Sequence, residues 1–134
     1  MNVLTKARSP LLVGAGAIAV CAGLVLRDPN QPGSWGLCPV LWTTGYYCPG
    51  CGMLRATHAA LTGDVGRIAS YNPLWFVAVP ALVALWVLSM RNAFSAEERR
   101  VTVPTWAYVA VTVVLTVFGV IRNLPGMEVL RPPV

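Results

Sequence analysis

The chain has 134 residues, of which 56% are hydrophobic and only 11% are charged, and its mean hydropathy is +0.63. A soluble domain usually carries about 25% charged residues because it needs a wet surface, so this composition argues against an ordinary soluble domain. The net charge of +5 indicates a membrane rather than nucleic acid, since the basic residues lie beside apolar runs. We therefore expect a single membrane domain over residues 1–134, with the lipid bilayer as its partner and no nucleic acid.

Three uncharged apolar runs stand out along the chain. They cover residues 11–26, 73–90 and 104–121. A helix needs about 20 residues to cross a bilayer, and each run approaches this length once its flanks are included. The sequence therefore predicts an all-α polytopic membrane protein with a long cysteine-bearing loop over 28–71. The three predicted transmembrane helices lie over about 10–27, 73–90 and 104–121.

The first run also resembles a signal peptide. Two basic residues precede it, and its apolar length fits either a signal peptide or a transmembrane helix. No small-x-small cleavage site occurs before Arg27, however, so a retained helix is favoured. Within this run Ala15, Ala19 and Gly23 recur every four residues. Such a stripe of small residues lets a second helix approach closely, and we expect a packing face there for a membrane-protein partner.

The distribution of basic residues orients these helices. Five basic residues lie in the short segments 1–10 and 91–103, and five are spread over the longer segments 27–71 and 122–134. Basic residues concentrate near helix ends on the cytoplasmic side of a membrane. The sequence thus predicts a multi-pass cell-membrane protein with a cytoplasmic N-terminus and an extracytoplasmic loop. Cysteines in that loop then lie in an oxidising compartment.

The two halves of the 28–71 loop differ in character. The first half is rich in proline, glycine and aromatic residues, and it lacks both the alternation of a strand and the 3.6-residue period of a helix. We expect it to be irregular and to lie against the membrane surface. The second half predicts two short interfacial helices, over about 51–61 and 65–71. Gly63 should end the first of them and Asp64 should cap the second.

The stretch "YYCPGCGMLRA", residues 46–56, concentrates the polar chemistry of the chain. Cys48 lies just ahead of the first short helix, where unpaired N–H groups and the helix dipole favour a thiolate. Cys51, Arg55 and His58 follow at the spacing i, i+4 and i+7 and share one face of that helix. This stretch is the candidate functional or stapling centre of the loop.

These residues and their neighbours resemble an uncharacterised bacterial membrane family known as domain of unknown function 2752. The resemblance rests on a Cys-Pro pair, a Cys-Pro-x-Cys-Gly-x-x-Arg-Ala motif, a Gly-Asp pair and an Asn-Pro-Leu that opens a transmembrane helix. It extends over roughly residues 36–90 and implies a family without an established activity. The positions that carry it include Cys38, Pro39, Gly45, Cys48, Pro49, Cys51, Gly52, Arg55, Ala56, Gly63, Asp64, Asn72, Pro73 and Leu74.

The sequence leaves three roles open for these cysteines, of which a structural one is favoured. A disulfide from Cys38 to Cys48 or Cys51 would staple the loop, and the protein would be a non-catalytic accessory or assembly subunit of a membrane complex. The apolar runs contain no charged residue, which argues against a transporter or pump acting alone. With this role we expect the protein not to be an enzyme, while the thiol alternative below leaves enzymatic chemistry open.

Two alternatives assign chemistry to the same residues. Cys38, Cys48, Cys51 and His58 have the number and softness of zinc ligands, although a histidine seven residues after the last cysteine is unusual. Alternatively the protein exchanges thiols and disulfides, with Cys48 attacking, Cys51 resolving and Cys38 as a third partner. The chain shows no resemblance to a thioredoxin βαβ unit, which weakens this second alternative.

Overall fold

Helices form all the regular structure that the computed structural model describes, over residues 3–31, 34, 38–95 and 103–132. The predicted all-α class is thereby confirmed for these residues. The elements in chain order are α1 (Val3–Leu26), α2 (Pro39–Thr44), α3 (Met53–Leu61), α4 (Val65–Tyr71), α5 (Trp75–Phe94), α6 (Thr105–Ile121) and a 3-10 helix, η1 (Glu128–Leu130).

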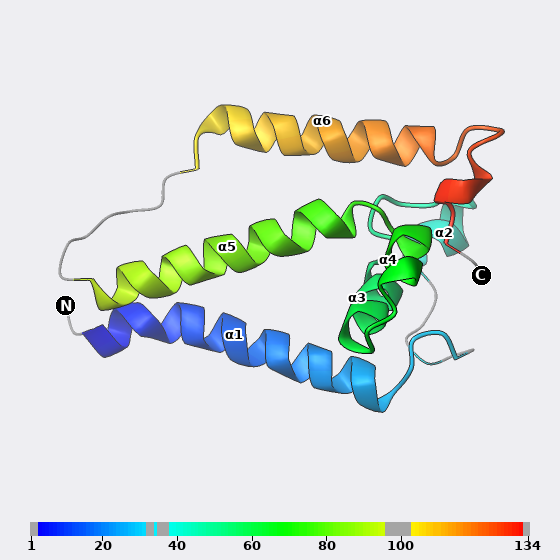
Figure 1. The fold of residues 1–134 in the computed structure, drawn as a ribbon. Coiled ribbons are helices and arrows are strands. Elements are labelled where there is room, and N and C mark those ends of the chain that lie inside the picture. The colour runs from blue at the N-terminus through cyan, green and yellow to red at the C-terminus, as the bar shows by residue number, and fades with distance from the viewer. Residues whose placement is uncertain (1–2, 32–33, 35–37, 96–102, 133–134) are drawn as a thin grey trace.

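The short elements gather at one end of the three long helices (Figure 1). This is the end at which α1 and α6 finish and α5 begins, and α2, α3, α4 and η1 all lie there. The start of α1 lies at the opposite end. The polar and sulfur-bearing part of the chain is therefore separated from the N-terminus by the full length of the long helices.

Two of the long helices are long and apolar enough to cross a membrane. Their segments Ala7–Leu26 and Trp75–Phe94 are each 20 residues long, with mean hydropathies of 2.1 and 1.6. Only 6% of the most apolar window of each is buried inside the chain, so most of their apolar side chains face outward. α6 is a shorter apolar helix of 17 residues.

The long helices extend somewhat beyond the apolar runs. α1 begins at Val3, well ahead of the apolar run, and contains Pro10. α5 runs on to Phe94, past the end of its apolar run at residue 90. Once a helix is nucleated, each further residue adds a backbone hydrogen bond, so α5 continues into the polar residues that follow its apolar run. α6 matches its predicted span to within one residue at its start.

α2 corrects the prediction that the first half of the loop is irregular. Pro39 occupies its first turn, where the missing proline N–H costs no hydrogen bond. Gly45 ends it in the left-handed region, with φ of 73°, and donates its N–H to the Leu41 carbonyl at 2.9 Å. A helix of six residues has fewer than two turns, which is too short for a helical period to appear in the sequence.

The two predicted short helices are present as α3 and α4, and they pack against each other. Gly63 makes the turn between them with φ of 82°. Asp64 precedes α4 without the predicted capping hydrogen bond, and its carboxylate pairs with Arg67 at 3.1 Å instead. The buried residues between the two helices form a small core beside residues 48–51. They are Ala56, Ala59, Ile68 and Tyr71.

α1 is joined to the remainder of the fold near both of its ends. Gly14 gives room to Trp86 of α5, since a Cβ at Gly14 would lie 2.9 Å from the indole ring. The indole Nε1 donates a hydrogen bond to the Pro10 carbonyl at 2.9 Å. Near its other end α1 contacts α3, and Leu24 there is fully buried. The first helix is therefore an integral part of the fold.

Gly52 gives a direct test of how tightly the chain is packed next to Cys51. It precedes α3 with φ of 85°, and an added Cβ would collide with the Tyr71 carbonyl. We expect Gly52→Ala to lower the free energy of unfolding by more than about 3 kcal/mol. Gly63→Ala has a similar φ in open space and should cost only about 1–2 kcal/mol. Thermal unfolding in detergent compares the two variants, and equal losses would contradict the collision at Gly52.

Candidate functional site

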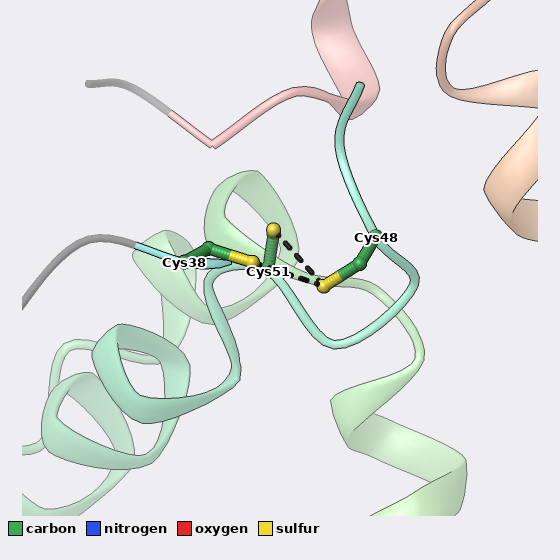
Figure 2. A group of neighbouring side chains, drawn as sticks. All are labelled: Cys38, Cys48 and Cys51. Carbon is green, nitrogen blue, oxygen red and sulfur yellow. Dashed lines mark hydrogen bonds between the residues drawn. The ribbon is translucent and has the colours of Figure 1, made fainter. Parts of the chain in front are cut away.

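Three cysteine side chains converge among the short helices (Figure 2). The Cys48 Sγ lies 3.1 Å from the Cys51 Sγ and 3.5 Å from the Cys38 Sγ. All three sulfurs lie within 4.8 Å of one another, and none of them forms a disulfide. The fourth cysteine, Cys21, is in α1 and does not belong to this group.

The three thiols come from two segments of backbone. Cys38 immediately precedes α2, whereas Cys48 and Cys51 lie close together between α2 and α3. The Cys51 N–H donates to the Cys48 carbonyl at 3.1 Å, so the Cys-Pro-Gly-Cys sequence closes as a tight turn. This cysteine turn, residues 48–51, brings two sulfurs together, and the start of α2 delivers the third.

Asn72 holds the cysteine turn from the start of α5. The side chain is completely buried, and its Nδ2 donates to the carbonyls of Pro49 at 2.8 Å and Cys51 at 3.1 Å. Its Oδ1 accepts the Leu74 N–H at 3.0 Å. Both ends of this buried amide are therefore satisfied, as a buried polar group requires. The predicted helix-opening asparagine thus also fixes the position of the thiols.

Arg122 and Asn123 hold the same turn from the end of α6. The Arg122 Nη1 donates to the carbonyls of Cys48 at 2.8 Å and Cys51 at 3.3 Å. The Asn123 side chain bonds both backbone groups of Tyr47, accepting from its N–H and donating to its carbonyl at 2.9 Å each. We call the three side chains that donate to the cysteine turn and Tyr47 the carbonyl clamp. Its members are Asn72, Arg122 and Asn123.

The clamp leaves no carbonyl between residues 47 and 51 without a hydrogen bond. Side chains serve four of these carbonyls, and the fifth, of Gly50, accepts the Met53 N–H at 3.0 Å. A buried carbonyl left without a donor costs about 1–3 kcal/mol, so this pattern strongly favours one backbone conformation. The thiols are held in place by the backbone that carries them.

Arg122 is a buried cation among mostly neutral groups. It is 0% exposed, its Nη2 donates to the Leu130 carbonyl at 2.7 Å, and its Cζ lies 5.0 Å from the Phe118 ring centre. Burial lowers the pKa of its guanidinium, whereas the charges that Cys51 and Cys48 carry when deprotonated raise it. Its Nε is buried and has no hydrogen-bond acceptor among the described atoms.

The thiols differ in acidity. Burial has the largest effect on Cys51 and raises its pKa to about 12, and the neighbouring thiols of Cys48 and Cys38 add to this effect. Burial also acts to raise the pKa of Cys38, but the N–H groups of Leu41 and Val40, with the two other thiols, leave that pKa lowered. Cys38 is therefore more readily deprotonated than Cys51.

His58 and Arg55 lie on the predicted common face of α3, but they bind the end of α1 and the residues after it. The His58 Nδ1 lies 2.8 Å from the Leu24 carbonyl oxygen, and its Nε2 lies 3.5 Å from the Asp28 carboxylate. The Arg55 Nε donates to the Pro29 carbonyl at 3.3 Å. Of the four side chains considered as zinc ligands, the structure brings together the three cysteines and leaves the histidine outside the group.

The remaining motif residues shape the backbone around the cysteines. Pro49 lies against α6, since a Cβ at Gly119 would be 3.5 Å from its ring. Pro73 occupies the turn in which the Trp75 N–H donates to the Asn72 carbonyl at 3.0 Å, ahead of α5. These residues position the site and contribute no ligand atom to it.

The sequence did not identify Arg122 and Asn123 as site residues. A basic residue after an apolar helix is accounted for by the helix dipole and by lipid headgroups, so it does not signal a buried contact. Arg122 bonds a carbonyl 74 residues away in the chain. No local spacing can reveal a contact over that distance.

Together, these features define an all-α protein with two helices apolar enough to cross a membrane and a cluster of three thiols beside them. The family model described as "Protein of unknown function (DUF2752)" matches residues 38–86, from the first clustered cysteine into α5. This match confirms the resemblance that the motifs indicated. Arg122 and Asn123 lie beyond the matched residues. No curated protein and no solved structure matches the chain.

The difference in acidity predicts an order of alkylation in the metal-free protein. At pH 8 a thiol with a pKa of about 12 is deprotonated in roughly 1 molecule in 10,000. We expect iodoacetamide to modify Cys38 at least about ten times faster than Cys51, and the Cys51 rate to rise with pH. All three cysteines lie on the tryptic peptide 28–55, so fragment-ion mass spectrometry locates each label.

Denatured protein is the control for this measurement, because unfolding removes the burial and should bring the two alkylation rates together. Equal rates in the folded protein would show that Cys51 is not buried as described.

Proposed function

We propose that this protein is a three-span integral membrane protein that binds a zinc ion through Cys38, Cys48 and Cys51. The observation that carries the metal is the convergence of three sulfurs within 4.8 Å. Zinc–sulfur bonds of about 2.3 Å in a tetrahedral site place two sulfurs roughly 3.8 Å apart. The Sγ–Sγ distances of 3.1 and 3.5 Å require only small side-chain shifts to reach this spacing.

The number of thiols favours a metal over the disulfide staple that the sequence favoured. A disulfide joins two sulfurs and leaves the third thiol without a role, whereas a zinc ion uses all three. A metal ion also replaces the proton of a buried thiol, since zinc binds the thiolate and releases the proton. The pKa of Cys51 is raised to about 12, so zinc must displace the proton of this thiol in order to bind it.

The proposed role of the ion is to hold together two segments of the loop. These are the start of α2 and the cysteine turn that leads into α3, and the carbonyl clamp links the turn to α5 and α6. Three protein ligands leave a fourth position for water or for a ligand from another protein. This arrangement suits a non-catalytic accessory or assembly subunit of a membrane complex. Ala15 and Ala19 are exposed in the single chain and leave the small-residue face of α1 available to a partner.

Three features support the proposed membrane insertion, the retention of α1 and the orientation. The apolar side chains of α1 and α5 face outward, so they need an apolar environment that the chain itself does not supply. The Trp86 contact with Pro10 favours an α1 that is retained in the mature protein. The start of α1 and the cysteine cluster lie at opposite ends of the long helices (Figure 1). With the higher density of basic residues on the N-terminal side, the cluster is proposed to be extracytoplasmic.

Thiol–disulfide exchange is the second candidate, and it is favoured by the 3.1 Å between the Cys48 and Cys51 sulfurs. In this reaction the two thiols become a disulfide while a disulfide in a substrate protein becomes two thiols. The nearby Cys38, whose pKa is lowered, would act as a third exchanging group. Trapping a mixed disulfide on Cys48 in a Cys51→Ser variant would favour this candidate.

Zinc content tests the metal directly. We expect the detergent-purified protein to contain about one zinc ion per chain, and Cys38→Ser, Cys48→Ser and Cys51→Ser each to lower the occupancy severalfold, because each removes one of three ligands. Cys21→Ser is the matched control and should retain the metal, as should His58→Ala. Elemental analysis of the purified variants measures the ratio. Metal-free wild-type protein after zinc-supplemented purification would overturn the proposal.

Two exposed serines at opposite ends of the fold test the membrane orientation. Ser70 lies on α4 beside the site, and Ser95 follows the far end of α5. We expect a membrane-impermeant maleimide to label Ser70→Cys in intact cells and Ser95→Cys only after permeabilisation, with the unsubstituted protein as background. The reverse labelling pattern would place the cluster on the cytoplasmic side. Release of the protein by carbonate washing would remove the membrane assignment.

A further inference from the structure

Arg122 carries a charge for which the described part of the chain provides no counter-ion. The residue is 0% exposed, and no described carboxylate forms an ion pair with it. Its two Nη groups donate to three carbonyls, and its Nε remains without an acceptor. Because the side chain is sealed from the surface, solvent anions and lipid headgroups cannot reach it.

A buried charge without a partner of opposite sign is strongly unfavourable. Moving an ion into a protein interior costs several kcal/mol even after relaxation, and neutral dipoles repay only part of this. The carbonyls and the Phe118 and Tyr47 rings near Arg122 are such neutral groups. The buried guanidinium therefore indicates that an anion resides close to it when the protein is complete.

The thiol cluster lies beside Arg122 and is a place where that anion can form. Arg122 bonds the backbone of two of the three cysteines, Cys48 at 2.8 Å and Cys51 at 3.3 Å, and deprotonation of either thiol would favour the charged guanidinium. Three thiolates around a divalent ion have a net charge of −1, which one arginine neutralises. A monovalent ion would leave −2, and a disulfide beside a neutral thiol would leave the arginine without an anion.

We propose that Arg122 is the counter-ion of the cluster, so that Cys38, Cys48 and Cys51 bind a divalent thiophilic ion as a tris-thiolate of net charge −1. This inference rests on the proposed metal site and adds the charge state of that site and the class of ion it selects. The fourth ligand is then neutral, such as water or an uncharged donor from a partner. Arg122 acts here as a positioning residue that touches no metal.

Two substitutions separate the charge of Arg122 from its hydrogen bonds. Arg122→Gln keeps an amide donor and loses the charge, whereas Arg122→Lys keeps the charge and loses the planar fork. We expect Arg122→Gln to weaken zinc binding roughly 10- to 100-fold, the size of one charge interaction at an effective dielectric constant of about 20. Arg122→Lys loses the fork but keeps the charge, so it should bind zinc at least about threefold more tightly than Arg122→Gln. Competition with a chromophoric chelator in detergent measures both affinities.

Asn123→Ser is the matched control, because it removes the two hydrogen bonds between Asn123 and Tyr47 without changing the charge. It should bind zinc more tightly than Arg122→Gln. Equal losses in Arg122→Lys and Arg122→Gln would overturn the counter-ion role and leave Arg122 as a hydrogen-bond donor only. If Arg122→Gln does not fold, Arg122→Lys decides alone, and a loss of about 100-fold or more, the full effect expected for removing the charge, overturns the inference. A wild-type protein that binds no zinc refutes the metal site itself, which is a separate result.

Discussion

Hydrogen bonds from the carbonyl clamp to Tyr47 and the cysteine turn are the interaction on which the rest of the site depends. These residues offer a row of backbone acceptors, most of them partly buried, and each one left buried without a donor would cost about 1–3 kcal/mol. Asn72, Arg122 and Asn123 supply the donors from the ends of α5 and α6. A loop that connects two long helices is thereby positioned by the helices themselves.

This arrangement links the membrane part of the fold to its chemistry. The long helices have outward-facing apolar side chains and few polar groups, so their ends are where polar side chains can gather. α3 and α4 contribute a small core of their own, which gives the start of α3 a fixed base. The thiols are held between that core and the two helix ends. A zinc ion at the cluster would join the start of α2 to the cysteine turn through the sulfurs, so metal and clamp would stabilise one another.

Sequence patterns predicted the parts of this structure that depend on nearby residues. The three apolar runs predicted α1, α5 and α6, and the positions of Gly63 and Asp64 helped to predict α3 and α4. α2 was missed because six residues show no period. The convergence of Cys38 with the Cys48–Cys51 pair was foreseen only as one of several possible roles.

Long-range contacts were not predictable in the same way. The helix face predicted for Cys51 and His58 is absent, because Gly52 has a left-handed φ and α3 begins only at Met53, and His58 binds the end of α1 instead. Arg122 has the same appearance in the sequence as any basic residue at a membrane helix end. Its burial becomes visible only when α6 is placed beside the cysteine turn. Spacing therefore identified candidate ligands, and tertiary structure selected among them.

Zinc K-edge X-ray absorption on the purified protein tests the three-thiolate centre most directly. We expect three sulfur scatterers at about 2.3 Å and one lighter nitrogen or oxygen scatterer at about 2.0–2.2 Å. A first shell of nitrogen and oxygen alone, or one with a single sulfur, would contradict a zinc ion held by Cys38, Cys48 and Cys51.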